Sequence, residues 1–186
     1  MQTIHQSKSA IAQERIWISR AQSNPEHFAP LYEKYYNPIF RFVYRRTNRE
    51  ELSADITSQV FLKAMMNIGK YEHRGLPFSA WLYRIASNEI NMVVRAKKVQ
   101  RYVSIEDAGL ERMMEALEPE YDAERESLVI KSLNQLSTEE VQFLELRFFE
   151  NKPFKEVGHI MKVTENNAKV KIYRIIGKIK KNIKLK

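Results

Sequence analysis

A strongly acidic strip divides this chain of 186 residues into two basic segments. Between Ser104 and Ser127 there are nine acidic residues and two arginines, a net charge of −7, although the whole chain carries +8. Gly109 and Pro119 lie within the strip, as is typical of a connecting segment. A chain of this length is long enough for two small domains. We therefore predict an N-terminal domain, an acidic linker and a C-terminal domain, at residues 13–102, 103–122 and 123–186.

Two interpretations of the strip stay open. It is either a solvated spacer, or a segment whose negative charge keeps it off DNA or lets it lie in a basic channel of a partner.

Helix-capping patterns recur along both segments, and no segment alternates polar and apolar residues with a period of two. Asn24 and Asn37 each precede a proline, and Ser137 and Asn48 each have a glutamate three residues later, the spacing of a capping box. Only five Gly and six Pro are present, which favours helices over a turn-rich β fold. We therefore predict an all-α fold. The expected helices lie at about residues 13–22, 25–36, 38–47, 49–67, 78–101, 123–135, 138–150, 153–161 and 165–183.

Several functional classes are disfavoured by what the sequence lacks. Without cysteine there is no disulfide, no thiolate zinc site and no thiol nucleophile. The four His are scattered, and neither clustered carboxylates nor a phosphate-cradling Gly loop is present, which argues against an enzyme acting on nucleic acid. We expect no catalytic residue, no cofactor and no metal. No apolar run indicates a signal peptide or a membrane span, and a cytoplasmic location is expected.

The net charge of +8 and the isoelectric point of about 9.6 indicate a polyanionic partner. The last part of the chain indicates how this polyanionic partner would be bound. Three helices follow one another between Ser137 and Ile183, and the three-residue step Lys162–Thr164 joins the last two. Thr164 is a good helix cap, and Gly158 lies where two helices must approach closely. This pattern predicts a helix-turn-helix.

The last helix of this motif has two faces. Isoleucines form an inner stripe, and Asn and basic residues are free to face outward. Asn, Arg and Lys near the start of a recognition helix are suited to reading base edges in the major groove, whereas later lysines mostly neutralise phosphates. The alternative is a solvated basic helix in a bundle. The candidate readers are Asn166, Asn167, Lys169, Lys171 and Arg174.

A second candidate site surrounds the loop Gly69–Pro77, where aromatic and cationic residues are interleaved. This combination suits unstacked single-stranded bases better than a closed duplex. Most other aromatic residues of the N-terminal segment have helical spacing and are expected in the core. The candidate residues are Lys70, Tyr71, His73, Arg74, Phe78 and Trp81 in and after the loop, and Arg84, Asn88 and Asn91 on the helix that follows.

Taken in order, these segments resemble the extracytoplasmic-function (ECF) sigma factors, the short class of bacterial sigma factors with two domains. The similarity runs from about Glu14 to Lys181. The matching motifs in the N-terminal segment are Phe28-x-x-Leu31-Tyr32, Asp55-Ile56-Thr57 with Val60-Phe61-Leu62-Lys63-Ala64, and Phe78-Ser79-Ala80-Trp81-Leu82-Tyr83-Arg84-Ile85-Ala86-x-Asn88. Those in the C-terminal segment are Leu133-x-x-Leu136, Glu156-Val157-Gly158-x-Ile160 and Lys169-x-Lys171-Ile172-Tyr173-Arg174.

The resemblance implies a transcription initiation factor that binds core RNA polymerase, directs it to promoters and assists strand opening. It assigns the Gly69–Pro77 loop and the following helix to the minus-ten element, with a flipped base trapped in the loop. It assigns the last helix to the minus-thirty-five element and adds Tyr173 to the candidate contact residues there. The implied partners are core RNA polymerase, promoter DNA in duplex and single-stranded form, and an anti-sigma factor. The implied polymerase-docking residues are Asp55, Ser58, Gln59, Leu62 and Lys63.

The chain departs from the family pattern at several positions. Ser58-Gln59 stand where Gln-Glu is usual, which removes an acidic residue from the docking helix, and Met92 stands where a polar residue is common. Lys162 occupies a turn position usually given to Gly, which predicts some backbone strain. Asn166-Asn167 replace a Gly-Thr pair, which predicts an altered promoter preference.

Two other hypotheses compete with this one. A stand-alone helix-turn-helix repressor or activator would bind an operator tightly without polymerase, usually as a dimer, but no coiled-coil seam or ligand-pocket pattern supports it. An enzyme acting on nucleic acid lacks the necessary residue clusters.

Overall fold

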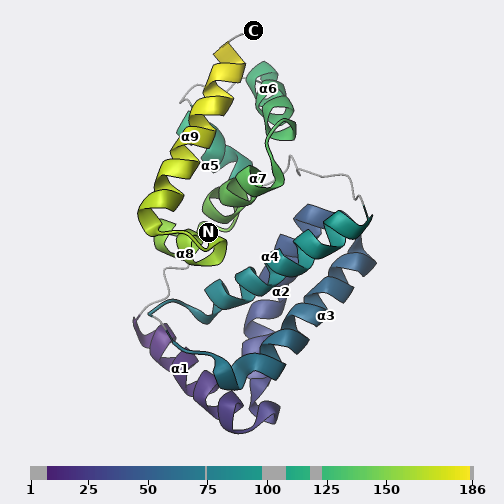
Figure 1. The fold of residues 1–186 in the computed structure, drawn as a ribbon, viewed down its shortest axis with the longest axis vertical. Helices are drawn as coiled ribbons and strands as arrows, with labels where there is room; N and C mark the ends of the chain where they lie inside the picture. Colours follow the sequence, from purple (N-terminus) through teal and green to yellow (C-terminus); the bar gives the residue numbers. More distant parts are fainter. Residues whose placement is uncertain (1–7, 74, 98–107, 118–122, 185–186) are drawn as a thin grey trace. The chain divides into compact units, whose positions relative to one another are not determined.

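The computed structural model describes residues 8–73, 75–97, 108–117 and 123–184, and within these ranges every regular element is a helix (Figure 1). The predicted all-α fold is confirmed. The chain forms two compact units, Met1–Tyr102 and Val103–Lys186. No helix of the described ranges is long and apolar enough to span a membrane.

The first unit is a bundle of three long helices, each in contact with the other two, with a shorter helix across one end (Figure 1). Its core includes Leu31, Ile39 and Phe42 from α2, and Leu82 and Ile90 from α4, all fully buried. The elements are α1 (Lys8–Ser23), the 3₁₀ helix η1 (Pro25–Phe28), α2 (Ala29–Thr47), α3 (Glu50–Asn67), the 3₁₀ helix η2 (Ile68–Lys70) and α4 (Phe78–Lys97).

The predicted break before Pro38 is wrong, because α2 runs unbroken through this proline. An interior proline removes one backbone hydrogen bond and costs about 3 kcal/mol in a helix. Buried residues occur on both sides of it, however, with Leu31 and Tyr35 before it and Ile39 and Phe42 after it. Their spacing makes one apolar face, and burial of that face against α3 and α4 outweighs the local preference.

The predicted capping box at Asn48 is also wrong. Asn48 ends α2 in the left-handed conformation (φ 48°), and its N–H donates to the carbonyl of Tyr44. Asn tolerates this conformation better than most residues, so it serves as a C-terminal cap. Two expected caps are confirmed: Asn24 accepts from the N–H of Glu26, and Ser137 forms a complete capping box with Glu140.

The second unit is built around one long C-terminal helix, α9 (Glu165–Lys184), drawn in yellow in Figure 1. Helices α6, α7 and α8 all pack against it. The predicted inner stripe of α9 is confirmed, since Ile172, Ile175, Ile176 and Ile179 are buried. The other elements are α5 (Ala108–Leu117), α6 (Ala123–Asn134), α7 (Thr138–Leu144), the π-helical segment η3 (Glu145–Phe149) and α8 (Phe154–Met161).

Part of the acidic strip forms a helix that the sequence patterns did not predict. Met113, Met114 and Leu117 of α5 are buried, and the Nε of Arg112 donates to the carbonyl of Phe148 at 2.8 Å. Gly109 lies so close to η3 that a Cβ on it would be 2.4 Å from the ring of Phe149. The apolar stripe of α5 is only about three turns long and stands among acidic residues, so it gives a weak periodic signal.

Candidate nucleic-acid interface

The turn between α8 and α9 brings two backbones into close contact. The N–H of Val163 donates to the carbonyl of Gly158 at 2.9 Å, and a Cβ on Gly158 would lie 2.8 Å from the carbonyl oxygen of Val163. Lys162 has a φ of 59°, the left-handed conformation that was expected of a position usually given to Gly. The hydroxyl of Thr164 accepts from the N–H of Asn167 at 3.2 Å and so caps α9. The predicted helix-turn-helix is confirmed.

The candidate minus-thirty-five residues lie on the solvent side of α9. Asn166, Asn167, Lys169 and Arg174 are exposed, and Tyr173 is 57% exposed. Asn167 and Arg174 are seven residues apart and therefore lie on one face of the helix. The ring of Tyr173 lies beside that of Phe154 of α8, with centroids 6.2 Å apart.

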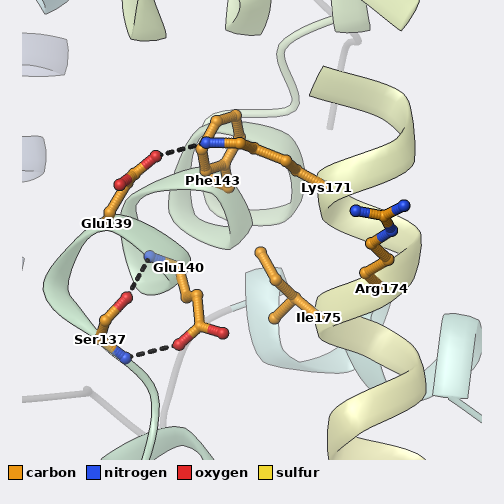
Figure 2. A pocket seen from close by; sticks show the side chains of 7 residues that line it. All are labelled: Ser137, Glu139, Glu140, Phe143, Lys171, Arg174 and Ile175. Carbon is orange, nitrogen blue, oxygen red and sulfur yellow. Dashed lines mark hydrogen bonds and ion pairs between the residues drawn. The ribbon is translucent and has the colours of Figure 1, made fainter. Parts of the chain in front are cut away.

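Lys171 differs from these residues because it is half-buried and paired. Figure 2 shows its Nζ reaching Glu139 at the start of α7, 2.6 Å from Oε1, and it lies 5.1 Å from the centroid of the Phe143 ring. Glu139, Phe143 and Lys171 line a surface pocket, and Arg174 and Ile175 line the α9 side of it (Figure 2). Two turns beyond Lys171 along α9, Lys178 pairs with Glu140 at 3.1 Å.

The Glu140 carboxylate has a second role in the capping box of α7. It accepts from the N–H of Ser137 at 2.7 Å, and the Ser137 hydroxyl accepts from the N–H of Glu140 at 3.2 Å (Figure 2). Burial alone would raise the pKa of Glu140, but the hydrogen bonds from Ser137 and the charge of Lys178 together lower it. The acidic start of α7 is therefore held against the basic face of α9.

In the first unit, three aromatic residues of the candidate minus-ten site meet at the start of α4. The ring of Tyr71 lies 4.9 Å from that of Trp81 and 5.2 Å from that of Phe78, centroid to centroid. Burial, with a smaller effect of the Glu14 charge, raises the pKa of Tyr71 to about 12. Phe78 is fully buried, so it supports the cluster from the core and offers no ring face for a base. That is a correction to its expected place in the DNA-contacting set.

The other candidate minus-ten residues have different surroundings. Trp81, Arg84 and Asn88 follow one another at helical spacing on one face of α4; Trp81 and Arg84 are half-buried and Asn88 is exposed. Lys70 is exposed, and His73 and Asn91 are half-buried. The buried Nδ1 of His73 and Oδ1 of Asn91 have no hydrogen-bond partner within the described ranges. Arg74 lies outside the described residues.

Two residues of α1 that the sequence analysis did not select hold the Gly69–Pro77 loop. Glu14 is 1% exposed, and its Oε2 accepts from the backbone N–H of Phe78 at 2.7 Å. The Nε2 of Gln22 donates to the carbonyl oxygens of Ile68 at 3.0 Å and Tyr71 at 2.9 Å. A carboxylate at a helix position that is expected to be buried is a sequence signal that could have identified Glu14. No sequence pattern identifies Gln22.

The candidate polymerase-docking residues lie along α3. Asp55, Ser58, Gln59 and Leu62 are all exposed, and their spacing of three, one and three places them on one face of the helix. This face continues to Met66, which is 73% exposed, and Leu62 itself is 44% exposed. Lys63 lies off this face, and its Nζ pairs with Oε1 of Glu89 of α4 at 2.6 Å. Leu62 and Met66 are one turn apart, so they form a small exposed apolar patch on an otherwise polar face.

Both units match known families. Residues 31–99 match the model of sigma-70 region 2, and residues 132–181 match that of sigma-70, region 4. The chain belongs to the sigma-70 family. The first match contains α3, α4 and most of α2, and the second contains α8, the turn after it and most of α9.

Individual relatives place it in the ECF class. It is 27% identical over 167 residues to the ECF RNA polymerase sigma factor BldN of Streptomyces coelicolor, covering 86% of this chain and 61% of BldN. It is 25% identical over 150 residues to the ECF RNA polymerase sigma factor SigM of Bacillus subtilis, covering 81% of this chain and 91% of SigM. The structure of CnrH in complex with the cytosolic domain of CnrY shares the fold, with a TM-score of 0.64 and 17% identity over 92% of this chain and 97% of that chain. With regions 2 and 4, the chain is a transcription initiation factor: it binds RNA polymerase and directs initiation at promoters.

Proposed function

We propose that the two units of this sigma factor divide promoter recognition between them. The first unit, residues 13–102, docks on the polymerase clamp through the exposed face of α3, reads the minus-ten element and assists strand opening. The second, residues 123–186, reads the minus-thirty-five element with α9. The observation that carries the proposal is the cluster of Tyr71 and Trp81 at the start of α4, next to the polar face that bears Arg84 and Asn88.

Strand opening requires a base to leave the stack, at a cost of a few kcal/mol. Half-buried aromatic rings compensate for this cost, because stacking of a base on an aromatic side chain contributes about 1–3 kcal/mol. Arg84 supplies positive charge beside the rings, and Asn88 and Asn91 supply hydrogen-bonding groups. The proposed site therefore captures an unstacked base and does not need to pull apart a closed duplex by itself.

The proposed duplex contact uses the start of α9. Asn167 and Arg174 have the side chains that make bidentate contacts to adenine and guanine, and both are exposed on one face. Lys169, Asn166 and Tyr173 complete the proposed contact surface, and Lys171 contributes once it leaves Glu139.

Other assignments follow from the proposed role in transcription initiation. We assign residues 103–122 to the connection between the two units: its acidic composition suits a basic surface of the polymerase, and α5 within it stays packed on η3 of the second unit. The protein has no catalytic activity of its own, needs no cofactor and works in the cytoplasm, where its polymerase is found. An anti-sigma factor regulates it by covering one or both units.

The test is transcription with purified core polymerase and a library of promoters. We expect promoter-specific transcripts with core polymerase and weak duplex binding by the free protein. Trp81→Ala should abolish opening of a duplex promoter and retain activity on a promoter premelted at the minus-ten element. Failure to bind core polymerase, or opening at the wild-type rate by a fully folded Trp81→Ala protein, would contradict the proposal. Tight operator binding without polymerase would favour a stand-alone regulator instead.

A further inference from the structure

Glu14 is a buried carboxylate that joins three elements of the first unit. Its Oε2 accepts from the N–H of Phe78, the first residue of α4, at 2.7 Å. Its Oε1 accepts from the Nζ of Lys34 at 3.0 Å and from the hydroxyl of Tyr35, both on α2. A carboxylate that is 1% exposed is costly to bury unless it is paired and hydrogen-bonded. These contacts therefore hold α1 firmly to the start of α4.

Phe78 is the first residue of α4, so the contact with Glu14 is made at the N-terminus of that helix. The first N–H groups of a helix have no partner within the helix, and the helix dipole favours a negative charge at this end. Glu14 supplies both the acceptor and the charge. It reaches α4 three residues before Trp81, whose ring packs on those of Phe78 and Tyr71.

A second contact fixes the other end of the loop. Gln22 lies eight residues after Glu14, about 12 Å further along the helix axis. Its side-chain amide donates to the carbonyls of Ile68 and Tyr71, at 3.0 and 2.9 Å. Helix α1 thus holds the beginning of the Gly69–Pro77 loop through Gln22 and its end through Glu14.

From these contacts we infer that α1 sets the geometry of the strand-opening site, with Glu14 and Gln22 as positioning residues for Tyr71 and Trp81. The inference rests on the proposed role of this loop in capturing a minus-ten base. Glu14 is buried, so it acts through the backbone of Phe78 and does not touch DNA. Holding both ends of the loop lowers the entropy lost when a base is captured.

The test compares Glu14→Gln and Gln22→Ala with the wild-type protein, each assembled with core polymerase. Glu14→Gln keeps an acceptor for the Phe78 N–H but removes its charge, and Gln22→Ala removes two hydrogen bonds from an exposed side chain. Glu33→Gln is the matched control, because it removes one negative charge from an exposed position of α2.

Each positioning variant should open a duplex promoter about five- to tenfold more slowly than wild type, because Glu14→Gln weakens a charge-assisted hydrogen bond to a neutral one and Gln22→Ala removes two neutral hydrogen bonds. Both should work at the wild-type rate on a promoter premelted at the minus-ten element and should bind core polymerase with unchanged affinity. In a spectrophotometric titration, Glu14→Gln should lower the pKa of Tyr71 from about 12, because a nearby negative charge is removed.

Two results would overturn the inference. Wild-type opening by both positioning variants, with Trp81→Ala defective, would remove α1 from the mechanism and leave the proposed function intact. Equal losses on duplex and premelted promoters, with weaker polymerase binding, would show only a general role in folding. Wild-type opening by Trp81→Ala as well would instead contradict the proposed function.

Discussion

Nζ of Lys171 on α9 lies 2.6 Å from Oε1 of Glu139 on α7. The cation at the centre of the proposed reading face is therefore already paired with a carboxylate of the same unit. Lys178, two turns further along α9, is paired in the same way with Glu140. A phosphate that binds either lysine must displace a carboxylate, so these two glutamates lower the affinity of α9 for DNA.

Glu139→Gln should therefore strengthen duplex binding by the second unit. Glu139 is exposed and Lys171 is half-buried at the surface, and surface ion pairs contribute about 0–1 kcal/mol, so we expect an increase of up to about fivefold at moderate salt. The dependence of log K on log salt should become steeper by up to about 0.9 if the released Lys171 gains a phosphate. Fluorescence anisotropy over a salt series would measure both quantities.

Glu115→Gln provides the control for that experiment. Glu115 is exposed on α5 of the same unit, so the substitution changes the net charge equally without freeing a residue of α9. If the two variants change affinity and salt dependence by the same amount, the effect comes from net charge and not from the Glu139–Lys171 pair.

Gly158→Ala should destabilise the second unit. The added Cβ would lie 2.8 Å from the carbonyl oxygen of Val163 and 3.2 Å from the N–H nitrogen of Glu165, both of which belong to backbone and cannot move aside independently. Overpacking of this kind costs about 1–3 kcal/mol. Urea denaturation would measure the loss.

Gly177→Ala is the matched substitution with the opposite expected sign. Gly177 is exposed within α9, and a Cβ there would meet nothing within 4 Å. Alanine in an exposed helix is more favourable than glycine by about 1 kcal/mol. Equal effects of the two substitutions would contradict a close α8–α9 approach at Gly158.

The sequence predicted those parts of the fold where local and tertiary preferences agree. The α8–α9 turn combines a small residue at Gly158, a cap at Thr164 and a stripe of isoleucines, and all three favour the same geometry. The prediction failed at Pro38, where a local helix-breaking signal competed with a buried face. It also missed α5, whose apolar stripe is short and surrounded by acidic residues.

The candidate site was predictable in its exposed residues but not in its supports. Residue type and helical spacing were enough to select Trp81, Arg84 and Asn88. Glu14 is 64 residues from Phe78 in sequence, and Gln22 is 49 residues from Tyr71. Contacts of this range depend on how α1 packs in the folded unit, which no local pattern encodes. The burial of Phe78 also depends on this packing, so its place in an aromatic-rich segment wrongly predicts a DNA contact.

Ser137→Ala should weaken the start of α7 in a pH-dependent way. Loss of the hydroxyl removes one half of the capping box, at a cost of about 1 kcal/mol near neutral pH. The pKa of Glu140 is lowered in the folded protein, so its interactions stabilise the fold above the ordinary pKa of a glutamate and are lost as the pH falls through the lowered value. In the variant, the pKa of Glu140 should rise. An NMR titration of the Glu140 carboxyl would show this shift, and an unchanged pKa would mean that the backbone N–H of residue 137 and Lys178 set it without the hydroxyl.

Arg174→Ala and Lys169→Ala should separate base reading from phosphate binding on α9. Both side chains are exposed, but Arg174 shares a face with Asn167, and its planar guanidinium can form a bidentate contact with guanine. Its loss should cost about 1–3 kcal/mol at one base pair of the minus-thirty-five element and relax the preference there. Lys169→Ala should instead weaken binding to all sequences alike and reduce the salt slope by about 0.9. Binding measured against a library of single-base changes, with polymerase present, distinguishes the two patterns. If Arg174→Ala weakens every sequence equally, Arg174 binds phosphate, and the reading role falls to Asn166 and Asn167.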